Sequence, residues 1–251
     1  MARVLILSSY VAASRVGGFA QTRAFDDRNV WSVLAPTVLF GRHPGLGAPG
    51  GGAVPDAMFA DIIAGIEGAE GGPRFDGVLT GYFASVGQVE AAAAAIDRAL
   101  VANPAAVILV DPIMGDAPKG LYVKPEVASA LRQHLLPRAT ILTPNAWEAE
   151  FLTDIAAHTP DGALAAAKAL GKPTVVTSVA KADRLGALYW TGSQAWFAHA
   201  PRKDADIKGA GDALAADLLS QLLRNTVAEI ALQHAVSAAA GTKAVVERLA
   251  I

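Results

Sequence analysis

The segment Ala106–Val110 is an unbroken apolar run that ends at an aspartate, Asp111. A strand that is apolar on both faces is typical of the centre of a parallel sheet covered by helices on both sides. A shorter apolar run lies at Val4–Leu7, a β-branched segment that favours a strand lies at Thr174–Thr177, and Ala-rich segments of helical length such as Val89–Val101 lie between them. This alternation predicts a three-layer α/β fold, in which helices cover both faces of a mostly parallel sheet.

The remaining elements follow the same alternation. Gly17 and Gly18 are expected in a loop after the first strand. Leu185–Trp190 and Gln194–His199 flank a Thr-Gly-Ser turn, a pattern that predicts a hairpin and therefore an antiparallel edge of the sheet. We expect further strands at Val33–Phe40, Phe75–Thr80 and Thr140–Leu142, and helices at Met58–Ile66, Pro125–His134, Trp147–Leu152, Leu164–Leu170, Asp212–Leu223 and Val227–Val245.

Length and composition restrict the class of protein. The chain has 251 residues, which fits a single α/β domain over residues 1–251 better than two domains. The formal net charge is −2, so no basic field is available to hold nucleic acid. Cysteine is absent, which excludes disulfides and cysteine nucleophiles. Neither a signal peptide nor a bilayer-spanning segment is recognised, so we expect a cytoplasmic protein with a small-molecule substrate and no membrane partner.

The string Gly209-Ala210-Gly211-Asp212 directly precedes a helical run. Two glycines allow a sharp turn that presents bare backbone N–H groups, and such groups at a helix N-terminus form an anion site. Asp212 would lie in the first helical turn, where a candidate base could face the same site. The alternative interpretation is an ordinary helix start with an aspartate cap, and this string alone does not decide between the two.

Two sets of oxygen ligands follow predicted strands. Asp111 and Asp116 could meet around a cation or a polyphosphate, although Asp-Pro and Gly-Asp are also common turn pairs. Asn145 and Glu148 are three residues apart at an expected helix start, a spacing that brings both side chains to one side of the helix and suits a hydrated Mg²⁺. The alternative for this second pair is a capping box.

Thr177 and Ser178 end another expected strand and could bind a phosphate oxygen, with a satisfied strand end as the alternative. All of these groups fall at the carboxyl ends of strands, where open α/β sheets bind ligands. Together they supply phosphate donors, magnesium acceptors and one candidate base, which are the parts that phosphoryl transfer requires. The sequence contains no Walker P-loop, no Rossmann glycine motif after the first strand and no His-Glu-x-x-His zinc motif.

These motifs resemble those of a known family. Gly209–Asp212 is similar to the Gly-Thr-Gly-Asp motif of ribokinase-like kinases, and Asn145–Glu148 to their Asn-x-x-Glu motif. The chain resembles pyridoxal kinases in particular through Asp111–Asp116, Tyr122-Val123, Thr143–Glu150, Val78–Tyr82, Thr177-Ser178, Ser9, Val16-Gly17, Val38–Phe40 and His43. This resemblance spans almost the whole chain. It implies a ribokinase-like three-layer α/β/α fold, a reaction that uses ATP and Mg²⁺, and a homodimer.

The resemblance also implies roles for individual residues. Asp212 would take the proton from the primary hydroxyl of a B6 vitamer as that hydroxyl attacks the γ-phosphate. The charge that develops would be stabilised by the backbone N–H groups of Gly209, Ala210 and Gly211. Magnesium and the phosphates would be organised by Asp111, Asn145 and Glu148. The residues expected along the nucleotide are Asp116, Tyr122, Thr177 and Ser178. The residues expected around the vitamer are Ser9, Val16, His43 and Tyr82.

The chain departs from the family pattern in two places. Ala210 replaces the usual threonine, which keeps the N–H group and loses a hydroxyl, and Lys208 beside it could face phosphate or solvent. Residues 41–55, which are crowded with Gly and Pro, are expected to form a substrate flap. Within it Pro44 replaces a threonine that would touch the substrate, and Arg42 adds a charge.

Because residues 41–55 differ from the family pattern, the sequence is consistent with more than one function. The first hypothesis is a pyridoxal kinase, and a close alternative is a kinase for another hydroxymethyl compound, such as the pyrimidine precursor of thiamine. A different class is a non-catalytic protein of this fold that binds a vitamer or a nucleotide, although the retained Asp212, Asn145 and Glu148 argue against it. An oligomeric scaffold explains none of the polar residues at the strand ends.

Overall fold

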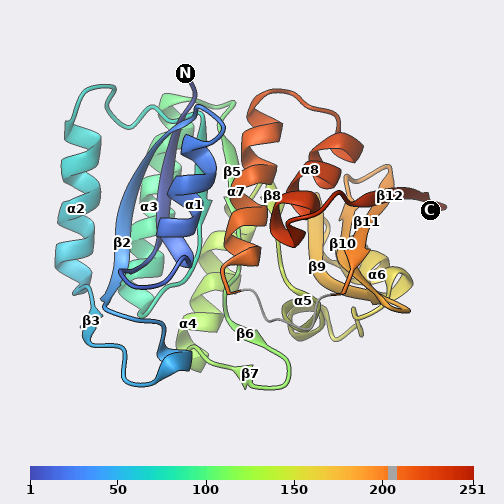
Figure 1. Cartoon of the computed structure of the whole chain (residues 1–251). Coiled ribbons are helices and arrows are strands. Elements are labelled where there is room, and N and C mark those ends of the chain that lie inside the picture. The colour runs from blue at the N-terminus through green and yellow to red at the C-terminus, as the bar shows by residue number, and fades with distance from the viewer. Residues whose placement is uncertain (203–207) are drawn as a thin grey trace.

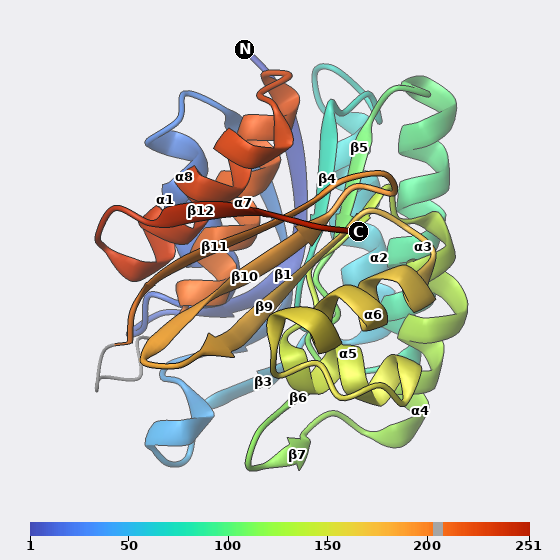
Figure 2. The same ribbon diagram turned by 90° about the vertical axis from the view of Figure 1, so that its right-hand side faces the viewer.

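One large twisted sheet runs between two layers of helices in the computed structural model, which describes residues 1–202 and 208–251 (Figure 1, Figure 2). Within the described residues the sheet has ten strands, in the order β12-β11-β10-β9-β8-β5-β4-β1-β2-β3. These strands are β1 (Arg3–Val11), β2 (Trp31–Phe40), β3 (Gly51–Ala53), β4 (Gly77–Thr80), β5 (Val107–Val110), β8 (Ile141–Leu142), β9 (Thr174–Lys181), β10 (Arg184–Trp190), β11 (Ala195–Pro201) and β12 (Val245–Leu249).

The centre of the sheet is parallel, which confirms the prediction from the apolar runs. Parallel pairs join β2, β1, β4, β5, β8 and β9. Antiparallel pairs add β3 at one end of the sheet, and β10, β11 and β12 at the other. The predicted hairpin is confirmed as β10–β11, but β12 pairs outside it and forms the edge.

The expectation of a helix over Val227–Val245 is therefore wrong at its end. The helix stops at Ala240, because Gly241 takes a left-handed conformation with φ +60° and closes it. Val245 then begins the edge strand.

Helices cover both faces of the sheet. One face carries α1 (Gly17–Asp26), α7 (Ala210–Leu223) and α8 (Ala228–Ala240) (Figure 2). The other face carries α2 (Asp56–Gly68), α3 (Val86–Ala102) and α4 (Pro125–Ala130), with α5 (Ala146–Thr153) and α6 (Pro160–Leu170) beside β9. None of the described helices is long and apolar enough to cross a membrane.

The strand β1 shows how one sequence serves both layers. Its side chains alternate between faces, so Val4 and Ile6 pack with the core under α7 and α8, whereas Leu5 and Leu7 pack with the core under α2 and α3. All four side chains are fully buried. An apolar strand in the middle of the sheet is therefore required by this arrangement of layers.

Gly17 and Gly18 begin α1, so the expectation that they lie in a loop is wrong. Gly17 has φ +58°, and a Cβ there would lie 2.1 Å from Ser9 Oγ. A Cβ at Gly18 would lie 2.5 Å from the side chain of Leu34. The two glycines let the helix start in close contact with the strands, which is a tertiary reason that a local sequence pattern does not show.

Two segments extend beyond the carboxyl ends of the central strands (Figure 1). The first is a small hairpin of β6 (Gly115–Asp116) and β7 (Gly120–Leu121), which was not predicted. The second is the predicted flap, residues 41–55. Within it Pro44–Leu46 forms a single 3-10 turn, and Gly51–Ala53 pairs with β2 as the end strand of the sheet.

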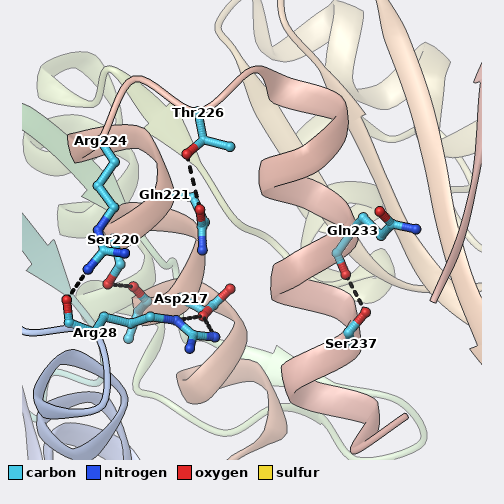
Figure 3. A network of polar contacts seen from close by, with 9 residues as sticks. Arg28, Asp217, Ser220, Gln221, Arg224, Thr226, Gln233 and Ser237 are labelled. Carbon is cyan, nitrogen blue, oxygen red and sulfur yellow. Dashed lines mark hydrogen bonds and ion pairs between the residues drawn. The ribbon is translucent and has the colours of Figure 1, made fainter. Parts of the chain in front are cut away.

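A polar network fixes α7 against the end of α1 (Figure 3). Arg28 Nε donates a 2.6 Å hydrogen bond to Oδ1 of the buried Asp217. Arg224, at the end of α7, donates in turn to the backbone carbonyl of Arg28. These contacts hold α7 to the end of α1.

Candidate active site

The order of the strands reverses at β1, because β2 lies on one side and β4, β5 and β8 lie on the other. Such a switch point leaves a crevice beyond the carboxyl ends of the strands. Three of the predicted residues come shortly after these strands: Asp111 directly follows β5, Tyr82 is the second residue after β4, and Asn145 is the third residue after β8. The first turn of α7 lies at the same edge (Figure 1).

Asp212 occupies the first turn of α7, as predicted. Its Oδ2 accepts a 2.8 Å hydrogen bond from the backbone N–H of Gly17, and its Oδ1 lies 3.4 Å from Nε2 of Gln21. Burial raises the pKa of this carboxyl to about 6, and the hydrogen bond from Gly17 acts in the opposite direction. The side chain is thus tied to α1, and it is not an N-cap of its own helix.

The turn before Asp212 has the geometry that its glycines predicted. Gly209 is the N-cap residue with φ +82°, and a Cβ there would lie 2.1 Å from the carbonyl oxygen of Arg15. The first hydrogen bond of the helix runs from Ala213 N–H to Gly209 O. The N–H groups of Ala210 and Gly211 precede that bond and have no acceptor within the helix. Gly211 is exposed, so the turn presents backbone donors to solvent.

Asn145 and Glu148 form the capping box that was the alternative interpretation of their spacing. Asn145 Oδ1 accepts from the N–H of Glu148, and Glu148 Oε2 accepts from the N–H of Asn145, both at 2.9 Å. Glu148 Oε1 also accepts from the N–H of Met114 at 2.8 Å. The carboxylate therefore links α5 to the segment between β5 and β6.

Two buried carboxyl groups, Asp111 and Glu148, share this part of the site. Burial raises the pKa of Glu148 to about 8, although hydrogen bonds from three backbone N–H groups lower it. Burial also raises the pKa of Asp111, and repulsion from Glu148 and Asp212 adds to the effect. The three acids predicted separately from sequence are therefore close enough to interact electrostatically.

These acids fit a hydrated divalent cation. Burial, and to a lesser extent repulsion between carboxylates, raises the pKa values of Asp111 and Glu148, and a nearby cation would stabilise the ionised form of both. Both oxygens of Glu148 already accept backbone N–H groups, which leaves contact through water. Across residues 1–202 and 208–251 no three acidic or histidine side chains are placed to hold a metal ion. Magnesium keeps several waters and takes further ligands from phosphates, so a site of this kind suits it.

The residues expected along the nucleotide lie around the same acids. Asp116 is exposed on β6, and its charge contributes to the raised pKa of Glu148. Partial burial and the charges of Glu148 and Asp111 raise the pKa of the Tyr122 phenol, which places it beside the acidic cluster. Thr177 pairs with Asn145 through an isolated bridge, and Ser178 next to it is exposed.

The residues expected around the vitamer lie on β1, at the start of α1, after β4 and in the flap. Ser9 lies against Gly17, and Val16 directly precedes that glycine. The backbone carbonyl of Tyr82 accepts a 2.6 Å hydrogen bond from Thr37 Oγ1, which holds the end of β4 to β2. His43 Nδ1 accepts from the N–H of Gly45 at 3.0 Å and thereby caps the short turn of the flap.

The two unusual residues of the flap have structural roles. Arg42 Nε donates a 2.8 Å hydrogen bond to the carbonyl of Ala48, across the flap. A Cβ at Gly47, where φ is +110°, would lie 3.0 Å from Nη2 of Arg42, so glycine leaves room for the guanidinium. Pro44 is the first residue of the 3-10 turn, a position that needs no N–H.

Three functional contacts were not predicted from sequence. Gly17 and Gln21 contact Asp212 from α1, and Met114 donates to Glu148. The pair Gly17-Gly18 was the only local sign of a close approach. No sequence pattern marks Gln21, and the Asp111–Asp116 motif contains Met114 without indicating its contact with Glu148, because both contacts depend on the packing of segments that are distant in the chain.

Comparisons with known proteins agree with this geometry. The profile of the phosphomethylpyrimidine kinase family matches residues 70–247. The pyridoxal kinase PdxY of Deinococcus radiodurans is 36% identical over 94% of this chain and 84% of its own length. That of Leifsonia xyli is 34% identical over 94% of this chain and 86% of its own length.

Solved structures give the same result for the fold. Pyridoxal kinase from Entamoeba histolytica superposes with a TM-score of 0.88 at 28% identity, covering 96% of this chain and 88% of that one. Pyridoxal kinase from Leishmania donovani in complex with ADP and pyridoxine superposes with a TM-score of 0.90 at 25% identity, covering 99% of both chains. The chain therefore belongs to the pyridoxal kinase family, and its fold is the ribokinase-like α/β/α sandwich.

Proposed function

We propose that this protein transfers the γ-phosphoryl group of ATP to the hydroxymethyl group of pyridoxal or a related B6 vitamer. The observation that carries the proposal is the position of Asp212 in the first turn of α7, directly after the glycine turn that starts at Gly209. The pKa of this carboxylate is about 6. A base with this pKa is ionised at neutral pH and still accepts a proton readily. The relatives solved with ADP together with pyridoxine or pyridoxamine support the choice of substrates.

In this proposal Asp212 accepts the proton of the primary hydroxyl. The hydroxyl oxygen forms a bond to the γ-phosphorus, the bond from that phosphorus to the β–γ bridging oxygen breaks, and ADP leaves. Gly17 and Gln21 hold the carboxylate from the side of α1, so its remaining lone pairs are available to the substrate. Orientation of the base before reaction is a large part of what such a site contributes.

The turn that precedes Asp212 is proposed to stabilise the charge on the transferred group. The donors are the backbone N–H groups of Gly209, Ala210 and Gly211, at the positive end of α7. Ala210 in place of threonine does not change this set, because the donor is the main chain.

The acidic cluster is proposed to hold the metal and the nucleotide. Asp111, Asn145 and Glu148 would hold Mg²⁺ through water, and the ion would neutralise the phosphate oxygens. Along the nucleotide we place Asp116, Tyr122, Thr177 and Ser178. Around the vitamer we place Ser9, Val16, His43 and Tyr82, with residues 41–55 as a flap over them. A single domain of residues 1–251, a homodimer and a cytoplasmic setting remain predictions.

A second candidate is a kinase for the hydroxymethylpyrimidine precursor of thiamine. The family profile that covers residues 70–247 favours it, since that family is described as phosphomethylpyrimidine kinase. Arg42 and Pro44 in the flap also allow it, because Pro44 replaces a threonine expected to touch the vitamer and Arg42 adds a charge. The phosphoryl-transfer groups would be the same for both substrates.

The test is ATP consumption by the purified protein with Mg²⁺, measured separately with pyridoxal, pyridoxine, pyridoxamine and hydroxymethylpyrimidine, and without an acceptor. Turnover with the pyridine vitamers supports the proposal. Turnover confined to the pyrimidine replaces it with the second candidate. ATP binding without turnover on any acceptor contradicts both and supports a non-catalytic binding protein of this fold.

A further inference from the structure

Gln21 is a fully buried polar side chain on α1, outside every motif considered above. Its Nε2 lies 3.4 Å from Asp212 Oδ1, while the backbone N–H of Gly17 donates to Asp212 Oδ2 at 2.8 Å. Each oxygen of the proposed base therefore has its own donor, and both donors come from one helix. Two donors on different oxygens define the plane of a carboxylate, which a single donor does not.

Packing alone does not account for an amide at this position. Gln21 Oε1 has no hydrogen-bond partner among the residues that the structure describes, and neither has Oγ of the fully buried Ser8. Both side chains lie near Gly81, where a Cβ would be 2.3 Å from Ser8 Oγ and 3.5 Å from Gln21 Nε2. A buried acceptor without a partner destabilises a fold, and an apolar side chain of equal length would fill this space without that cost.

We propose that Gln21 is a positioning residue for Asp212: its amide N–H holds Oδ1 and keeps the carboxylate ionised and aimed at the substrate hydroxyl. That Asp212 acts on a substrate rests on the proposed function, but the contact between Gln21 and Asp212 does not depend on the substrate. The direction in which Gln21 changes the pKa of Asp212 follows from charge. A donor to a carboxylate stabilises the ionised form, so it opposes the burial that raises the pKa of Asp212.

Other groups near Asp212 must be separated from this effect. Asp111 after β5 and the phenol of Tyr122 interact with Asp212 electrostatically. Arg15 and Lys208 lie beside the turn at Gly209, and α8 contributes Ala238 and Ala239 at this end of α7. Substitution of Gln21 changes no charge, so the charges of these neighbours stay constant in the comparison.

The decisive variant is Gln21→Met, which has nearly the same length and no N–H. We expect the acidic limb of kcat/KM against pH to move to higher pH by about half to one pH unit, because a hydrogen bond to a charged group is lost. At pH 6 kcat should fall by about two- to fivefold, with recovery at pH 8, while KM for the vitamer stays within about twofold. A shorter amide, Gln21→Asn, should show the same shift because its N–H does not reach Asp212.

A second measurement decides the inference without turnover. The ¹³Cγ resonance of Asp212, identified by its absence in Asp212→Asn, gives the pKa of this carboxyl in each variant. The control is Gln221→Met, which removes another largely buried glutamine from the far end of α7. We expect a higher pKa in both Gln21 variants and an unchanged pKa in the control.

The outcomes separate the two proposals. An unchanged Asp212 pKa in both folded Gln21 variants, or a loss of kcat that is equal at all pH values, overturns the role of Gln21. A wild-type protein that phosphorylates none of the acceptors overturns the proposed function, and the resonance of Asp212 still reports whether Gln21 holds it.

Discussion

The backbone N–H of Gly17 donates a 2.8 Å hydrogen bond to Oδ2 of Asp212, a residue 195 positions further along the chain. The first turn of α1 therefore meets the first turn of α7 at the carboxyl edge of the sheet. Gly17 adopts φ +58° and has no room for a side chain, because Ser9 lies against it. The conformation of one turn thus holds one oxygen of the proposed base in the other.

Asp212→Asn tests the base directly. The amide keeps the shape of the side chain and cannot accept the proton, so turnover should fall by about 10²- to 10⁴-fold. Affinity for ADP, measured by calorimetry, should stay close to that of the wild type. The matched control is Asp161→Asn, an acid in the first turn of α6, which should leave turnover unchanged. Equal turnover of Asp212→Asn and wild type would remove Asp212 from the mechanism.

The pH dependence of kcat/KM should carry a limb with an apparent pKa of about 6. Burial raises the pKa of Asp212, and the ionised form is the active one. Activity should therefore be complete above the limb and fall by about tenfold for each pH unit below it. Initial rates from pH 5 to 8 with saturating ATP measure this. A flat profile down to pH 5 contradicts the assignment.

The centre of the fold could be predicted because its signals are local. Ala106–Val110 is apolar on both faces, and the structure places it as β5 between two parallel neighbours. Asp212 could be placed in a first helical turn because glycines and an acid before a helical run are a local pattern. These two inferences needed only the properties of neighbouring residues.

What could not be predicted depends on tertiary contact. Gly17-Gly18 has the composition of a loop, and it becomes a helix start only because it packs on Ser9 and Leu34. Gln21 has no local pattern, since its partner Asp212 is 191 residues away. The strand at Val245–Leu249 depends on β11 as a neighbour, and its alternation is too short to distinguish it from the end of a helix.

Binding of Mg²⁺ with ADP should release protons at pH 7. The pKa of Glu148 is about 8 in the absence of a cation, so its carboxyl group is largely protonated at pH 7. A divalent cation nearby would lower this pKa, and the proton would be released. Titration calorimetry in two buffers of different ionisation enthalpy counts the protons. Glu148→Gln can keep the capping box but does not titrate, so the count should drop by up to about one. Release that is undiminished in this variant assigns the protons to another group.

Gly209→Ala should damage both stability and turnover. The new Cβ meets the carbonyl of Arg15 at 2.1 Å, and φ of +82° is unfavourable for alanine. We expect a loss of about 1–3 kcal/mol in the free energy of unfolding and a lower kcat, because the N–H groups of the turn must shift. Gly192→Ala is the control, since Gly192 has φ +103° with open space around it. It should cost some stability and leave kcat unchanged. Equal kcat in both variants would show that the turn does not act on the transferred group.

Arg42→Ala tests whether residues 41–55 act as the substrate flap. Arg42 braces this segment through Ala48, and His43 caps the turn beside it. Loss of the brace removes a hydrogen bond worth about 1 kcal/mol, which corresponds to a rise of about three- to tenfold in KM for the vitamer. KM for ATP and kcat should hardly change, because the hydrogen bond from Arg42 Nε to Ala48 lies within residues 41–55.

The control for the flap is Arg74→Ala. Arg74 is also exposed, and it donates a hydrogen bond to the backbone carbonyl of Ala102. It lies before the first residue of β4, so it is near the amino ends of the parallel strands, whereas the site lies at their carboxyl ends. Its loss should leave both KM values unchanged. If Arg42→Ala raises KM for ATP as much as KM for the vitamer, the segment acts on the whole site, and its role as a flap for the vitamer is wrong. If neither value changes, Arg42 stabilises a loop that substrate binding does not use.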